Sequence, residues 1–331
     1  MAASISKLLL KNSDLNSRAN YNMENSEYSG IVNKLEQKYE AMGQDLSSYL
    51  DGLLYSDYLT YWDYIHLDTL LSLQNPKTSL PDEKVFIIYH QITELYFNLA
   101  LAEIKQIAEH PSITKDFFIA RLDRLIRYFQ NLESSFSIMV DGLEPEQFLK
   151  FRMALLPASG FQSAQYRLIE ICSTDLINLV GVPDRERLRG ADLKSQLENL
   201  YWRSGATELA SGKKTLTLRQ FENKYMKLFL ETGQAHQQTN LLKIMQRNFL
   251  DDADVATKLK QYDQLVNVHW AMAHMRSASK YLKRNPEDIK ATGGTNWQKY
   301  LPPRFQRIIF FPELWTENEK EGWGSSLSVY R

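Results

Sequence analysis

Hydrophobic periodicity is the feature that most constrains this chain, because apolar residues recur every three or four positions along most of its length. That spacing gathers them on one face of an α-helix, whereas a half-buried strand needs strict alternation of apolar and polar residues. No sustained alternation bounded by hairpin turns occurs. Turn signals, among them Asn75-Pro76, His110-Pro111 and Gly181-Val182-Pro183, fall between the periodic segments. We therefore predict an all-α fold, a helical bundle.

The expected helices and domains follow from these signals. Helices are predicted over about 26–50, 64–75, 82–109, 113–141, 145–156, 159–180, 187–200, 217–234, 237–248 and 252–283. The more polar segment 181–236 is predicted to be a small helical insertion within a main domain of residues 26–331. Residues 1–25 are predicted to be a flexible arm, with a transit peptide as the weaker alternative. The part from Lys290 onward is expected to be mostly irregular.

Composition and charge exclude several function classes. The 331 residues are 44% hydrophobic, and 39 basic side chains nearly balance 40 acidic ones. This balance offers no overall field for nucleic acid or an anionic membrane, and no apolar run approaches the roughly 20 residues that span a bilayer. The single cysteine, Cys172, excludes an internal disulfide and a cysteine-rich metal site. We expect a cytoplasmic protein that binds neither nucleic acid nor membrane.

The histidines are the main candidates for metal or proton chemistry. No two of the six stand in the His-Glu-x-x-His pattern of a zinc protease. His269 and His274 are five residues apart, about 140° around a helix, so they cannot easily share one ion. Gly293-Gly294 follows no predicted strand and lacks the spacing of a phosphate-binding loop. Hydrolytic metal chemistry and nucleotide chemistry are therefore disfavoured.

His274 lies on a helix whose small side chains could accept a flat cofactor. Residues at helical spacing mark the inward face: Val266, Trp270, Ala273 and Ser277. Ala271, Ser277 and Ala278 leave a shallow surface on which a macrocycle could lie while Nε2 reaches an iron. A core histidine bonded to a neighbouring helix is the ordinary alternative, and the pattern taken alone favours it.

Two further residues could bind a small molecule. His90 lies on an apolar helix beside Phe86, where an imidazole could hydrogen-bond a buried N–H or move a proton, although a satisfied buried polar residue is the commoner case. Arg152 follows Phe148 and Phe151 near a helix end, where its guanidinium could take a carboxylate in two hydrogen bonds. A surface salt bridge is the more frequent use of arginine.

Several longer motifs occur in a fixed order across about 61–315. These are Tyr61-x-x-Tyr64-x-x-Leu67-Asp68-x-Leu70-Leu71-x-x-Gln74, Asp82-Glu83-x-x-Phe86-Ile87-Ile88-x-His90-Gln91-x-x-Glu94-Leu95, Phe151-Arg152, Pro157-Ala158-Ser159-Gly160-Phe161-Gln162-Ser163-x-Gln165-Tyr166-Arg167, Trp270-x-x-x-His274-Met275, Thr292-Gly293-Gly294 and Phe310-Phe311-Pro312-Glu313-Leu314. In type and order they resemble the tryptophan 2,3-dioxygenases. The Pro157–Arg167 stretch is the most specific of them.

The resemblance implies a b-type haem and O2 as co-substrate. His274 would be the axial ligand of the iron, Trp270 would belong to the haem site and Ser159 would lie at the haem edge. In this family the indole C2–C3 bond of L-tryptophan is cleaved to give N-formylkynurenine. A homotetramer, in which an N-terminal segment reaches towards a neighbouring active site, is also implied.

The resemblance likewise implies how the substrate is held. Arg152 would pair with the substrate carboxylate, Thr292 with its head group, and His90 with the indole N–H. The walls of the ring pocket would be Tyr61, Phe86, Phe148 and Phe151.

Two departures from the family pattern leave alternatives open. The substrate loop reads Thr292-Gly293-Gly294-Thr295-Asn296-Trp297 where the family usually has Thr-Gly-Gly-Ser-Ser-Gly, and Pro81 replaces a common histidine before Asp82-Glu83. Trp297 could narrow the pocket, so a haem monooxygenase or hydroxylase acting on another indole or aromatic amino acid is a second hypothesis. A non-catalytic haem sensor is a third, disfavoured because a sensor needs neither His90 nor Arg152.

Overall fold

The computed structural model describes residues 27–55, 59–152, 160–207, 213–282 and 302–325. Internal contacts divide the chain into two units, Met1–Leu73 and Gln74–Arg331. Within the described residues the regular structure is helical, and the β-type pairing consists of two isolated bridges. The all-α prediction is confirmed. The predicted arm over 1–25 lies outside the described residues.

The described residues of the first unit form the helices α2 (Glu27–Ala41), α3 (Leu46–Leu54), α4 (Tyr61–Tyr64) and α5 (Leu67–Ser72). The single helix predicted over 26–50 is wrong, because Gly43 adopts a φ of +67° and Asp45 caps a new helix by accepting from the amides of Ser47 and Ser48. A second break falls at His66, whose φ of 52° separates α4 from α5.

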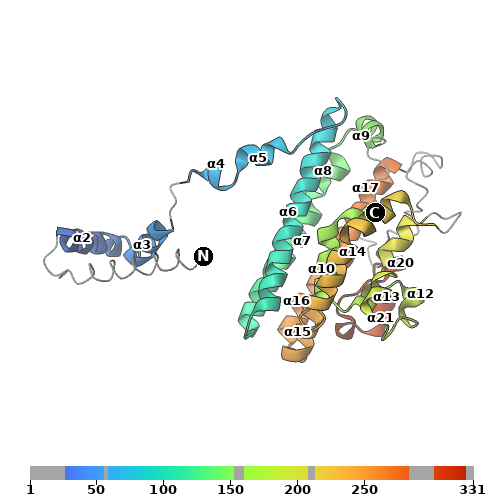
Figure 1. Cartoon of the computed structure of the whole chain (residues 1–331). Helices are drawn as coiled ribbons and strands as arrows, with labels where there is room; N and C mark the ends of the chain where they lie inside the picture. Colours follow the sequence, from blue (N-terminus) through green and yellow to red (C-terminus); the bar gives the residue numbers. More distant parts are fainter. Residues whose placement is uncertain (1–26, 56–58, 153–159, 208–212, 283–301, 326–331) are drawn as a thin grey trace, which may run out of the picture. The chain divides into compact units, whose positions relative to one another are not determined.

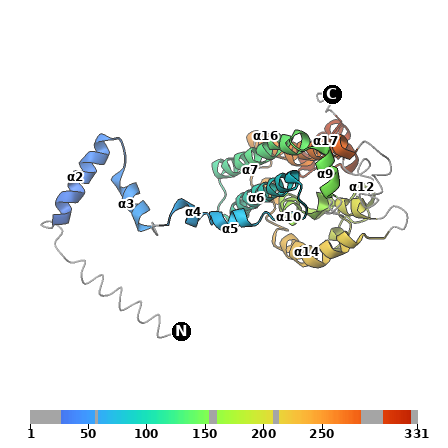
Figure 2. The same cartoon turned by 90° about the horizontal axis from the view of Figure 1, so that it is seen from above.

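Four helices form the centre of the second unit: α6 (Pro81–Glu109), α7 (Lys115–Ser135), α10 (Ala164–Ser173) and α16 (Ala253–Gln264). α6 packs against both α7 and α10, and α7 packs against α16 (Figures 1 and 2). Their shared core includes fully buried side chains such as Phe118, Leu125, Phe129 and Tyr262. Burial of this apolar face, at about 25 cal/mol per Å², is the main stabilising term of the bundle.

The start of α6 is held by its own acidic residue. Pro81 occupies the first helical position, where its missing N–H costs nothing. The buried carboxylate of Glu83 accepts hydrogen bonds from the amides of Lys77 and Thr78 at 2.8 and 2.7 Å, which closes the preceding loop onto the helix.

Further helices, all of them short except α14, cover the ends and one side of this bundle. They are α8 (Ser137–Asp141), α9 (Pro145–Arg152), η3 (Gly160–Gln162), α11 (Leu176–Leu179), α12 (Val182–Arg185), α13 (Leu193–Leu197), η4 (Tyr201–Ala206), α14 (Leu216–Ala235), α15 (Leu241–Asn248), α20 (Pro303–Gln306), η6 (Pro312–Leu314) and α21 (Glu317–Glu321). The helix predicted over 187–200 is wrong except at Leu193–Leu197. A bridge from Val180 to Leu200 closes this segment as a loop, and Arg185 donates to the carbonyls of Asn178 and Val180.

The long helix predicted over 252–283 is interrupted. α16 leads into a π-helical turn, η5 (Leu265–Trp270), and then into α17 (Ala271–Leu282). In this π turn the four consecutive side chains from Leu265 to Val268 are all buried, which an α-helix with one inward face does not allow. A π turn adds one residue to a helical turn and so changes which residues face inward after it.

The C-terminal segment packs against the start of the π turn. The buried carboxylate of Asp263 accepts from the backbone amides of Phe310 and Phe311 and from the indole of Trp315. It also accepts from the Asn267 side chain, at 2.7 Å. The prediction of mostly irregular structure from Lys290 onward holds for much of 302–325, although three short helices occur there and Phe310 and Phe311 are fully buried.

Candidate functional site

His274 lies on the second turn of α17, and its own helix sets the position of its proton. Nδ1 lies 3.1 Å from the carbonyl oxygen of Trp270. Because a carbonyl only accepts, Nδ1 carries the proton and Nε2 keeps the lone pair. Desolvation lowers the pKa of His274 to about 4, so the ring is neutral at pH 7. A neutral imidazole with a basic Nε2 is the form that binds a metal.

Aromatic rings hold the His274 imidazole in place. The Trp270 ring meets it edge-on with centroids 4.4 Å apart, and the Phe136 ring lies 4.5 Å from it. Trp270 and Phe136 are themselves buried and in contact, with centroids 5.3 Å apart. His269 points elsewhere, because its Nδ1 lies 3.3 Å from a carboxylate oxygen of Glu133 on α7.

His90 repeats the same local arrangement on α6. Its Nδ1 lies 2.8 Å from the carbonyl oxygen of Phe86, so Nδ1 is the protonated nitrogen and Nε2 is an acceptor. Desolvation by the surrounding residues lowers the pKa of His90 below its ordinary value, although the residue is exposed at the surface. His90 is also close enough to His274 for its charge to lower the pKa of that residue. The structure therefore brings together two neutral imidazoles from different helices.

Three of the predicted substrate residues form an aromatic cluster next to His90. The Phe86 ring lies tilted against the His90 ring with centroids 4.0 Å apart, and it contacts Phe151 at 5.6 Å and Phe148 at 6.3 Å. Phe151 is fully buried behind this group, whereas Phe86 and Phe148 are half-buried. The cluster offers an apolar surface for an aromatic ligand.

Arg152 ends α9 next to this aromatic cluster. Its guanidinium carbon lies 5.9 Å from the centre of the Phe148 ring, and the side chain is half-buried. α9 packs against α17, because Phe148 contacts Tyr281 at 4.7 Å. The Tyr281 hydroxyl also donates to the carbonyl of Val140 on α8, at 2.9 Å. The helix that carries Arg152 is thus held against the helix that carries His274.

The remaining predicted site residues are not placed with this group. Tyr61 belongs to the first unit, Met1–Leu73, and is exposed there. Ser159, Thr292 and Trp297 lie outside the described residues. Their roles stay predictions.

The start of α10 contributes supporting residues that we did not predict. Ser163 caps the helix by accepting from the amide of Tyr166. Gln165 donates to the Glu94 carbonyl at 2.9 Å on α6, four residues after His90, and the Tyr166 hydroxyl donates to the Val266 carbonyl in the π turn. All three belong to the Pro157–Arg167 motif, which was the only sequence signal for them.

Two cavities in the described part of the chain are lined by neither His90 nor His274. Among the described residues no three His, Cys, Asp or Glu side chains are grouped to hold a metal ion. One cavity of about 560 Å³ is lined by residues that include Asp175, His236 and Lys243. Another, of about 490 Å³, includes Leu101 and Cys172. No described helix is both long and apolar enough to cross a bilayer.

Comparison with known proteins identifies the family of the chain. A family model described as tryptophan 2,3-dioxygenase matches residues 51–192. A tryptophan 2,3-dioxygenase of Ruegeria sp. (strain TM1040) is 30% identical over 281 residues, which cover 79% of this chain and 92% of that protein. Proteins of the same name from Bradyrhizobium diazoefficiens and Ruegeria pomeroyi are 27% and 28% identical with equal coverage. The chain belongs to the tryptophan 2,3-dioxygenase family.

Proposed function

We propose that this chain is a haem-dependent dioxygenase that opens the indole ring of L-tryptophan with O2 to give N-formylkynurenine. Family membership and the retained histidines support this function. The observation that carries the proposal is the pair His90 and His274, which come from different helices, lie within electrostatic reach of each other and both keep Nε2 as the basic nitrogen. His274 could then ligate iron, while His90 could accept a hydrogen bond from the substrate.

The donor chemistry at His274 fits a b-type haem. Its imidazole is neutral at pH 7, its Nδ1 donates to the Trp270 carbonyl and its Nε2 is basic, so His274 would be able to hold haem iron. When bound, the haem supplies the activation of oxygen and the oxidation of the indole ring. The hydrogen bond from Nδ1 to the carbonyl keeps the imidazole plane in one orientation and raises the basicity of Nε2.

The protein side of the reaction is binding and orientation. His90 would accept the indole N–H through Nε2, and Phe86, Phe148 and Phe151 would wall the ring. Arg152 would pair with the carboxylate. Holding both ends of the substrate selects which carbon atoms face the oxidant. Tyr61, Thr292 and Ser159 are assigned on family resemblance alone, as a pocket wall, a head-group contact and a residue at the haem edge.

Counting the oxygen atoms in the product tests the proposal. Protein reconstituted with hemin is reduced without oxygen, mixed with L-tryptophan and exposed to O2, and the product is identified by mass spectrometry. A gain of two oxygen atoms supports the dioxygenase. A gain of one oxygen atom would support a monooxygenase instead, and intact haem binding without product would support a sensor; either result overturns the proposal.

Replacement of His274 tests the iron ligand separately from turnover. His274→Ala removes the only basic nitrogen that we assign to the iron, so the variant is expected to lose the Soret absorption of bound haem. His269→Ala is the matched control, because His269 lies on the same helical stretch but pairs with Glu133. Equal haem retention in both variants would refute the ligand assignment.

We also propose a homo-oligomer, supported by an exposed apolar stripe on α6. Its members are spaced by three and four residues in turn, and each is more than a third exposed: Val85, Ile88, Ile92, Leu95 and Leu99. Such spacing forms a continuous seam along one side of a helix, and soluble proteins seldom leave such seams exposed to water. A second copy of the chain is the occupant we assign to it.

A further inference from the structure

The π turn lies directly before the histidine proposed to hold iron. Trp270 is the last residue of the turn, and its carbonyl accepts from His274 Nδ1. Each residue advances an α-helix by about 100°, so removing the extra residue of a π turn would rotate the following helix by about that angle relative to the bundle. The direction in which His274 points therefore depends on this turn being kept.

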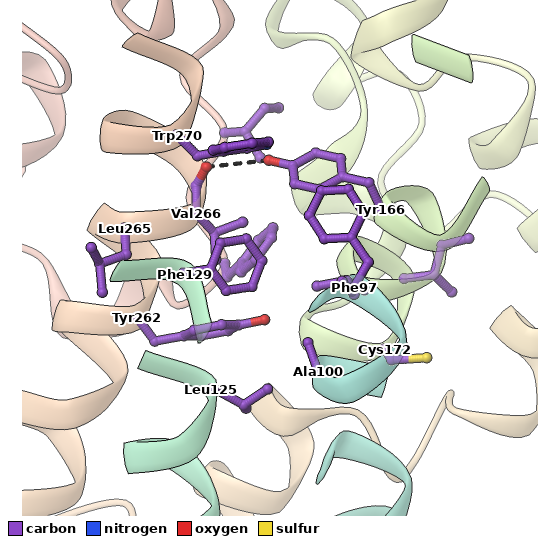
Figure 3. Close-up of a cluster of buried hydrophobic side chains, with 14 of the residues drawn as sticks. Phe97, Ala100, Leu125, Phe129, Tyr166, Cys172, Tyr262, Leu265, Val266 and Trp270 are labelled. Carbon is purple, nitrogen blue, oxygen red and sulfur yellow. Dashed lines mark hydrogen bonds between the residues drawn. The ribbon is translucent and has the colours of Figure 1, made fainter. Parts of the chain in front are cut away.

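A single hydroxyl from α10 reaches into the π turn. The Tyr166 hydroxyl donates to the carbonyl of Val266 at 3.2 Å, as Figure 3 shows. In a regular α-helix that carbonyl accepts from the amide four residues later, which is Trp270. In a π turn the spacing is five residues. The Tyr166 hydroxyl is a hydrogen-bond donor to the Val266 carbonyl that is available even when the amide of Trp270, four residues later, is not bonded to it.

Packing of the buried Tyr166 ring holds its hydroxyl next to the Val266 carbonyl. The Tyr166 ring is buried and contacts Phe97 at 5.3 Å, and Phe97 in turn meets the Trp270 ring edge-on at 6.0 Å. Burial raises the pKa of Tyr166 well above its ordinary value, so the group remains a donor throughout the physiological range. Since Val266 is fully buried, water cannot easily replace the donor.

We propose that Tyr166 is a positioning residue for His274: its hydroxyl stabilises the π turn and thereby sets the rotation of α17 and the orientation of the iron-binding imidazole. The inference rests on the proposed ligation of iron by His274. It assigns to Tyr166 no contact with haem or substrate.

A matched pair of substitutions isolates this hydroxyl. Tyr166→Phe removes only the oxygen that bonds the π turn. Tyr262→Phe is the control, because Tyr262 is also a buried tyrosine that links the same two parts of the fold, but its hydroxyl pairs with Ser173, at 3.1 Å. Both variants lose one buried hydrogen bond, so any general loss of stability is expected to be similar in the two.

Amide hydrogen exchange of the haem-free protein tests the effect on the turn itself. Peptides that cover 265–274 are expected to exchange faster in Tyr166→Phe than in Tyr262→Phe. Equal exchange in both variants would overturn the proposal before any haem is added. Because this measurement needs neither haem nor activity, its failure is distinct from a failure of the proposed function.

The haem-loaded protein tests the effect on the ligand. We expect Tyr166→Phe to retain haem but to shift or broaden the iron–histidine stretching band of the ferrous protein, and to lower kcat about three- to tenfold while KM changes little. The control variant should resemble the parent protein in both measurements. A band identical in the parent and in Tyr166→Phe would contradict the proposal.

A variant in which the iron ligand is detached from α17 tests whether Tyr166 acts through His274 or by another route. In His274→Gly supplied with imidazole, the ligand is no longer attached to α17. Adding Tyr166→Phe to that variant should then leave the iron–imidazole band unchanged. If the shift persisted, Tyr166 would be acting on the haem pocket by another route, and its role as a positioning residue for His274 would be refuted.

Discussion

His90 and His274 each donate a hydrogen bond from Nδ1 to the carbonyl four residues earlier. In both cases a hydrogen bond within the helix, and not a bond to a charged side chain, decides which nitrogen is basic. The two imidazoles are neutral for the same reason, since desolvation lowers the pKa of each. Their proposed roles differ only in what their Nε2 atoms face.

Arg152 is expected to determine the affinity for the amino acid. Arg152→Ala should keep haem but weaken L-tryptophan binding by about 2–5 kcal/mol, or roughly thirtyfold and more, because a desolvated carboxylate would lose its partner. Titrating the haem spectrum with L-tryptophan measures this. Arg152→Lys should recover only part of the affinity, since an ammonium lacks the planar pair of donors. Unchanged affinity in Arg152→Ala would refute the assignment.

His90 is expected to make substrate binding insensitive to moderate acid. Its pKa lies below 6.5, so Nε2 stays an acceptor as the pH falls through 6.5, and KM for L-tryptophan should remain flat there. The folded state binds fewer protons than the unfolded state between the lowered pKa and 6.5, so stability falls as the pH falls through that range. His90→Gln, which cannot titrate, is the control. A rise of KM centred on pH 6.5 in the parent protein would contradict this.

At the scale of elements, the start of α10 connects the two histidine helices. Gln165 bonds to α6 and Tyr166 bonds to the π turn, while Arg167 pairs with Glu170 at 3.0 Å and donates to Tyr201 in η4. One helical turn thus fixes α6, η5 and η4 in relation to each other. The Pro157–Arg167 motif predicted the family, but it could not predict these contacts, because the residues of α6, η5 and η4 that it contacts lie far away in the sequence.

Asp263 is expected to hold the C-terminal segment onto α16. Asp263→Asn leaves four N–H donors facing an amide with one acceptor oxygen, so the free energy of unfolding should fall by about 2–4 kcal/mol. Urea unfolding followed by fluorescence measures the loss. Asn267→Ala removes one of these donors and should cost about 1 kcal/mol. Equal stability of Asp263→Asn and the parent would contradict this account.

The same carboxyl has a predicted pH signature. Burial raises the pKa of Asp263 to about 6, from 3.8. The folded state then binds more protons than the unfolded state between those values, so the contribution of Asp263 to stability falls as the pH rises through this window. The advantage of the parent over Asp263→Asn should therefore shrink between about pH 4 and pH 6. An advantage that grows over this range would show that the pKa is lowered instead.

At the scale of the whole molecule, the exposed apolar stripe on α6 is the surface that we assign to the proposed oligomer. Leu95→Glu places a charge in the middle of the stripe and should dissociate the proposed oligomer, as measured by light scattering after gel filtration. Leu250→Glu is the control, because Leu250 is 58% exposed but lies outside the stripe. An unchanged mass for Leu95→Glu would exclude this face as the interface.

The sequence by itself determined the fold class and the family, and it predicted the main site residues. Helical periodicity and turn residues are local, so they predicted the long helices α6 and α14 well. The order of motifs predicted roles for His90, Arg152 and His274. The sequence could not show that 187–200 closes as a loop, since the apolar spacing there resembles that of a helix. The contacts that form the loop are the bridge between Val180 and Leu200 and the hydrogen bonds from Arg185.

Only the tertiary structure decided how α17, the helix of His274, is rotated about its axis relative to the bundle. A period of 3.6 residues describes α16 and α17 separately but contains no sign of the π turn between them, because the hydroxyl that bonds that turn comes from Tyr166, 100 residues earlier in the chain. The order of motifs can therefore propose which residue binds the iron. Its direction depends on a long-range hydrogen bond that exists only after α10 and the π turn have packed together.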